Sequence, residues 1–183
     1  MEAARPKFGV PKENPEDPPF RHPNAYLKQD GRILATVTTS YVDLILSLAS
    51  RLTSPFEVLY VLIVAEEELE GRYQLSPLRD FDELAGFLNP YRNFFEQDAR
   101  HDIWVRSEQD QAMIVYDHHD MLCLYGKEEL FEEVLLAEGL NPGPCEIPFP
   151  HFHNYNHGFD GLLHELLATP GLVKEPLTEH DLG

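Results

Sequence analysis

Cysteine is scarce in this chain: only Cys123 and Cys145 are present. Neither belongs to a Cys-x-x-Cys pair, so the count excludes a disulfide scaffold and a zinc knuckle built only from cysteines. Low cysteine usage without a disulfide framework is typical of proteins kept in a reducing compartment. The sequence therefore predicts a cytoplasmic protein.

Long apolar runs are also lacking. The longest uncharged apolar run covers residues 58–65, far fewer than the ~20 residues that a membrane-spanning helix needs. Residues 1–6 contain no apolar stretch of the kind found in a secretory signal. We therefore expect no membrane partner.

Basic side chains are in deficit, with 14 Lys and Arg residues against 32 Asp and Glu residues and a formal net charge of -18. Residues 1–50 hold six basic and six acidic side chains, so the whole excess belongs to residues 51–183. Such a surface repels phosphate backbones and attracts cations and basic proteins. We expect a basic protein partner and no nucleic acid.

Proline is concentrated at one end: six of the 15 prolines lie in residues 1–24. Proline removes backbone donors and blocks both helix and central strand. This composition predicts a flexible Pro-rich N-terminal arm at residues 1–24. The remaining residues, 25–183, are long and apolar enough for a single α+β domain with one core.

Hydrophobic periodicity and turn residues predict the secondary structure of that domain. We expect strands at residues 31–37, 56–65, 72–75, 102–107, 111–116 and 121–125, and helices at 41–52, 80–95 with an interruption at Asn89-Pro90, 127–138 and 159–168. The first six elements follow the order β-α-β-β-α-β. The predicted fold is a ferredoxin-like sandwich extended by an antiparallel meander and two C-terminal helices, a superfold that does not imply one function.

Histidine is the unusual component, because four of the nine residues fall between positions 151 and 164. Imidazole nitrogens bind zinc, and three of them with one open position make a catalytic zinc site. Alternate residues of an extended chain share a side, and helix positions i, i+3 and i+7 share a face. The leading expectation is a histidine-rich tract without function and no cofactor; the alternative is a zinc-type site. The candidate ligands are His151, His153, His157, Asp160 and His164.

A second cluster, Asp117-His118-His119-Asp120, lies in a predicted turn. If strands 102–107 and 111–116 pair antiparallel, His101 and Asp102 return to the same end of the sheet as this turn. Six titratable groups would then gather there. The alternative is an ordinary polar turn, since Asp favours turns by bonding its own backbone. The sequence does not fix whether the two histidine clusters meet.

Three functions are compatible with these features. The first is a non-catalytic, acidic inhibitor, immunity-like or regulatory protein that binds a basic partner, because no complete catalytic constellation is present. Its expected binding residues are Glu129, Glu132 and Glu133. The second is a metal-dependent enzyme or metal-binding module that uses the C-terminal histidines, with zinc as its cofactor. The third is an assembly subunit that docks through its N-terminal arm.

Overall fold

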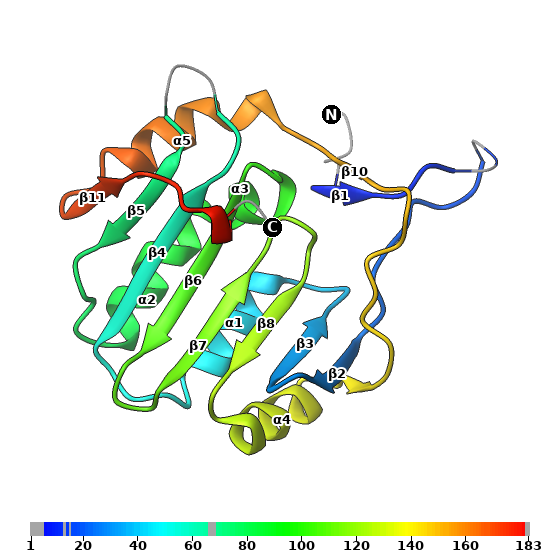
Figure 1. The fold of residues 1–183 in the computed structure, drawn as a ribbon, viewed down its shortest axis with the longest axis horizontal. Coiled ribbons are helices and arrows are strands. Elements are labelled where there is room, and N and C mark those ends of the chain that lie inside the picture. Colours follow the sequence, from blue (N-terminus) through cyan, green and yellow to red (C-terminus); the bar gives the residue numbers. More distant parts are fainter. Residues whose placement is uncertain (1–5, 13, 15, 66–68, 182–183) are drawn as a thin grey trace.

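The computed structural model describes residues 6–12, 14, 16–65 and 69–181. It is a mixed α+β fold dominated by a mostly antiparallel sheet of nine strands, with α1, α2 and α3 behind the sheet in Figure 1. The strands are β1 (Phe8–Gly9), β2 (Ala25–Gln29), β3 (Arg32–Thr36), β4 (Phe56–Leu62), β5 (Gly71–Leu75), β6 (His101–Ser107), β7 (Ala112–Tyr116), β8 (Leu122–Tyr125), β9 (Asn141–Pro142), β10 (Phe152–His153) and β11 (Leu172–Glu175). The α-helices are α1 (Tyr41–Ala49), α2 (Phe81–Leu88), α3 (Arg92–Gln97), α4 (Glu128–Ala137) and α5 (Asp160–Leu167), with short 3-10 turns at Asn89–Tyr91, His157–Phe159 and Glu179–Asp181.

The order of strands in the sheet is β11-β5-β4-β6-β7-β8-β3-β2-β9. Neighbours run antiparallel except for β2 and β9. The central strand β4 carries apolar side chains on both faces of the sheet, and Val58 and Val61, which point to opposite faces, are both fully buried. One hydrophobic core joins the sheet to its helices.

The α+β class and the meander β6-β7-β8 are confirmed, but the ferredoxin-like strand order is wrong. In a split β-α-β unit, two parallel strands joined by a helix flank one other strand. Here α1 joins β3 to β4, and three strands, β6, β7 and β8, lie between them. The reason is that β3 pairs with β8, which is distant in the chain, so α1 crosses a wider stretch of sheet.

Helix α1 begins as predicted and reaches the turn between β7 and β8. The Ser40 side chain accepts a hydrogen bond from the Asp43 backbone N–H and caps the helix. The next residue, Tyr41, stacks on Tyr116 with ring centres 4.7 Å apart, and its hydroxyl donates to the Asp120 carbonyl. The start of the helix therefore supports the histidine-bearing turn.

The part of the N-terminal arm that the structure describes packs on the fold, whereas the sequence predicts a flexible segment. Strand β1 pairs antiparallel with β10 in a separate two-stranded ribbon, visible at the upper right of Figure 1. Lys7 is fully buried, and Phe8 is 2% exposed. The arm is held by the buried side chains of Phe8 and Lys7. A prediction based on proline content alone does not take these two side chains into account.

Lys7 holds the arm to the turn between β7 and β8. Its Nζ donates to the Asp117 carbonyl at 2.7 Å, lies 3.8 Å from Asp120 Oδ1, and sits 3.4 Å from the centre of the Tyr116 ring. Burial lowers the pKa of Lys7, while the Asp120 and Asp117 carboxylates oppose this shift. A charge this deeply buried is tolerated only with such partners.

Replacing Lys7 with Met should lower the free energy of unfolding by about 2–4 kcal/mol, because it leaves a buried carbonyl and carboxylate without their cation. Chemical denaturation at neutral pH measures the loss. The matched control is Lys127→Met, since Lys127 is 46% exposed and pairs with Asp110 at the surface; it should cost about 0–1 kcal/mol. Equal losses in the two variants would contradict the anchoring role of Lys7.

Candidate metal centre

The register of β6 and β7 places a carboxylate beneath the first histidine of the turn. Ile103 pairs with Tyr116, so Asp102 lies at the same end of the sheet as Asp117, as the sequence predicts. Asp102 Oδ1 accepts from the His118 backbone N–H and lies 2.8 Å from His118 Nδ1. Because a carboxylate accepts, Nδ1 carries the hydrogen, and the His118 Nε2 lone pair is available to a metal.

The second histidine has its own carboxylate. His119 Nδ1 lies 3.5 Å from Asp117 Oδ2, while Asp117 Oδ1 accepts from the backbone N–H groups of His119 and Met121. Burial raises the pKa of Asp117, but the bond to His119 and the charge of Lys7 outweigh burial and hold it below its ordinary value. An ionised Asp117 therefore orients the His119 ring.

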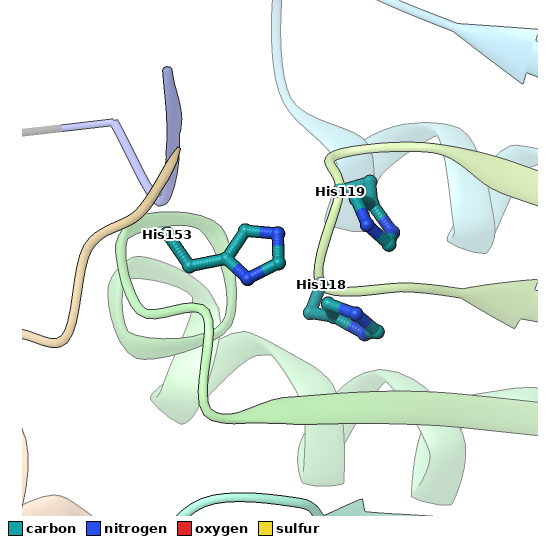
Figure 2. Close-up of side chains that lie close together, drawn as sticks. All are labelled: His118, His119 and His153. Carbon is teal, nitrogen blue, oxygen red and sulfur yellow. The ribbon is translucent and has the colours of Figure 1, made fainter. Parts of the chain in front are cut away.

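The third imidazole comes from the ribbon. His153 in β10 pairs with Phe8 in β1, and Figure 2 shows its ring directed toward the His118 and His119 rings. The ring centre of His153 lies 5.0 Å from that of His118 and 4.9 Å from that of His119, and the latter two are 4.1 Å apart. One nitrogen from each ring lies within 4.8 Å of the others. We call these three residues the histidine triad.

His153 is kept neutral by its surroundings. Burial lowers its pKa to about 4, and the neighbouring imidazoles act in the same direction. Its Nε2 is buried and has no hydrogen-bond partner among the described residues. A neutral imidazole with an unused nitrogen is the form that binds a metal ion.

Phe8 packs against two rings of the triad, His119 and His153, and against two further histidines. Its ring centre lies 5.2 Å from those of His22 and His151, 5.9 Å from that of His119 and 6.1 Å from that of His153. His22 Nε2 donates to the His119 carbonyl at 2.9 Å. The arm thus contributes both packing and a hydrogen bond to the site.

The predicted ligand set is split by the structure. His153 belongs to the triad and His151 lies beside it, but His157, Asp160 and His164 do not join them. Asp160 accepts from Arg100 at 2.7 Å, and its second oxygen pairs with His157 at 3.3 Å. His164 is exposed, and its Nδ1 is hydrogen-bonded to the Asp160 backbone carbonyl at 2.7 Å. His157 lies in the 3-10 turn before α5 rather than on that helix, and Arg100 binds the Asp160 carboxylate.

Arg100 also fixes the segment that follows His153. Together with Asp98 it forms a buried pair, and Asp98 Oδ2 accepts from the Asn156 backbone N–H at 2.9 Å. Asp98 is fully buried. These bonds hold the chain between β10 and α5 against the start of β6, and therefore position His153.

His101 was expected near the turn but faces the other side of the sheet. Successive side chains of a strand point to opposite faces, so Asp102 meets the triad while His101 lies under the helices. His101 is fully buried, with ring centres of Phe94, Tyr60 and Phe95 at 4.7, 5.2 and 5.5 Å. Burial, followed by the charge of Lys7, holds its pKa well below the usual value.

The glutamates expected to bind a partner are partly engaged within the chain. Glu132 accepts from the Tyr26 hydroxyl and pairs with Lys28, and Glu133 pairs with Arg51. Glu129 is exposed beside Lys28 and Lys127. The excess negative charge of this helix is therefore partly neutralised by its own neighbours.

Acid should destabilise the metal-free protein, with His101 contributing. In the unfolded chain the His101 side chain takes up a proton below about pH 6.5, whereas in the folded chain burial prevents this. The free energy of unfolding therefore falls with decreasing pH, by up to about 1.4 kcal/mol per pH unit for such a group. His101→Phe keeps the aromatic contacts and should flatten this fall between pH 7 and pH 5 in denaturation curves. The exposed-residue control His164→Gln should keep the wild-type slope. A wild-type slope in His101→Phe would refute the assignment.

Comparison with known proteins adds no family or fold assignment. No protein-family model, curated protein or solved structure matches the chain. Among residues 6–12, 14, 16–65 and 69–181, no helix has the length and apolar character needed to cross a bilayer. The chemistry of the histidine triad must therefore be judged from its own geometry.

Proposed function

We propose that the protein binds one divalent transition-metal ion of the zinc type through His118, His119 and His153. The observation that carries this proposal is the convergence of three ring nitrogens within 4.8 Å of one another. Asp102 and Asp117 orient two of the rings through Nδ1, an arrangement common around metal-binding histidines. The third ring supplies a buried nitrogen that has no other partner in the described chain.

The donor set suits the ion. Imidazole is a preferred ligand of zinc, copper and nickel, whereas magnesium and calcium prefer oxygen. Tetrahedral ligands at about 2.0–2.1 Å from zinc are about 3.4 Å apart, so nitrogens that lie within 4.8 Å of one another need to approach by at most about 1.4 Å. Side-chain rotation supplies movements of that size. The net charge of -18 also favours the approach of cations over anions.

Three histidines leave one coordination position to another ligand. With water in that position, the ion would act as a Lewis acid and activate the water. With a fourth side chain, the site would be closed and serve binding rather than hydrolysis. The site binds a metal ion whether the fourth ligand is water or a side chain, so metal binding is tested first.

Isothermal titration of chelator-treated protein without a histidine tag should show one zinc ion per chain. His118→Ala and His153→Ala should weaken binding about 100-fold or more, because each removes a direct ligand. Asp102→Asn should weaken binding about 10–100-fold, because the His118 ring loses its orienting carboxylate.

His164→Ala is the matched control, since this exposed histidine lies outside the triad, and it should bind zinc as the wild type does. Circular dichroism establishes that each variant is folded. Equal affinity for zinc in wild type and His153→Ala, or no binding by folded wild type, would refute the proposal.

A second candidate function is recognition of a basic protein, which the net charge of -18 favours. The side chain of Glu133 is 69% exposed, and Glu129 is exposed nearby. Reversal of charge at Glu129, Glu132 and Glu133 should weaken a salt-sensitive complex with the partner, measured by pull-down from the native host at two salt concentrations. If the three charge reversals do not weaken the complex, the partner-binding surface lies elsewhere on the protein. Docking through the arm is less supported, because Lys7 and Phe8 are buried within the chain itself.

A further inference from the structure

A fourth imidazole stands at the edge of the histidine triad. The ring centre of His151 lies 5.3 Å from that of His119 and 5.3 Å from that of His153. We propose that His151 is the fourth metal ligand, so that the ion is enclosed by four histidines and binds no catalytic water. This inference rests on the proposed metal-binding function and specifies the kind of site.

Ring spacings support a four-histidine site. In a tetrahedral site, nitrogens at about 2.0–2.1 Å from the ion place imidazole ring centres about 5 Å apart. Of the six ring pairs among these four histidines, five have separations between 4.1 and 5.3 Å. His151 is outside the group of ring nitrogens that lie within 4.8 Å of one another, so its ring must rotate toward the triad to complete the site.

The hydrogen bond of His151 prepares the right nitrogen. Its Nδ1 lies 3.0 Å from the Pro148 carbonyl, which can only accept, so Nδ1 carries the hydrogen and Nε2 carries the lone pair. His118 is in the same state through its hydrogen bond to Asp102, and the Asp117 carboxylate, 3.5 Å from His119 Nδ1, favours the same state for His119. A backbone carbonyl and two carboxylates therefore perform the same orienting role for three of the four rings.

The surroundings fit a closed site better than a hydrolytic one. Asp102 is hydrogen-bonded to the His118 ring, and Asp117 lies 3.5 Å from the His119 ring and accepts two backbone N–H groups, so neither carboxylate is free to act as a general base. Their two negative charges instead balance a divalent ion held by four neutral imidazoles. Phe8 packs on His151, and Phe149 lies 6.4 Å from it, so apolar rings border the fourth ligand.

The ligand count can be measured with cobalt as the probe. Each histidine bound through Nε2 to Co²⁺ presents one Nδ1–H, which gives a strongly shifted proton signal that disappears in D₂O. Wild-type protein loaded with Co²⁺ should show four such signals and His151→Ala three. Zinc affinity should fall about 10–100-fold in His151→Ala, as expected when one ligand is replaced by water. His157→Ala is the control, and it should keep four signals and the wild-type affinity.

The outcomes separate the two claims. If wild type and His151→Ala both show three signals and bind zinc with the same affinity, the role of His151 is overturned while the triad stays in place. Absence of cobalt and zinc binding by folded wild-type protein would overturn the proposed function itself. A signal lost from His151→Gln as well as from His151→Ala, with the folded spectrum retained, would confirm that coordination rather than packing is affected.

Discussion

One buried cation joins the N-terminal arm to the middle of the chain. Lys7 has no contact with water, so its charge is tolerated only where the Asp117 carbonyl, the Tyr116 ring and the Asp120 carboxylate surround it. Those partners belong to the turn between β7 and β8. The lysine therefore brings the N-terminal arm to that turn, and with the arm comes the β1–β10 ribbon.

The histidine triad is a consequence of that contact. Two of its members belong to the turn, and the third belongs to β10, which the main sheet does not include. Lys7 from one side and the Arg100–Asp98 pair from the other hold the ribbon segment in place. Because both anchors are buried ionic groups, the position of His153 depends on charge pairs rather than on a continuous sheet. A metal ion bound there would link the same two parts of the chain and stabilise the fold.

Local patterns predicted much of this structure. The meander follows from alternating apolar residues and polar turns, and its antiparallel register was enough to place Asp102 beside Asp117 and His118. Helix α1 follows from its Ser40 cap, and helices α4 and α5 follow from their apolar stripes. The ferredoxin-like order failed because local periodicity does not say which strand β3 will pair with.

The complete site could not be predicted for a related reason. Strands β1 and β10 are two residues long and lie in proline-containing segments, where no period exists to detect. Of the predicted helical ligands, Asp160 and His164 lie on α5 and His157 precedes it in a 3-10 turn, and Arg100, distant in sequence, binds the Asp160 carboxylate. The available signal in the sequence was the presence of two histidine clusters, at residues 117–120 and 151–164, and the sequence does not fix whether they meet.

The most direct test of the central claim is a crystal structure of zinc-soaked protein with diffraction recorded on both sides of the zinc absorption edge. We predict one anomalous peak per chain, located between the His118, His119 and His153 rings with each ligand nitrogen at about 2.0–2.1 Å. A peak elsewhere on the surface, or none at the triad at saturating zinc, would contradict the account.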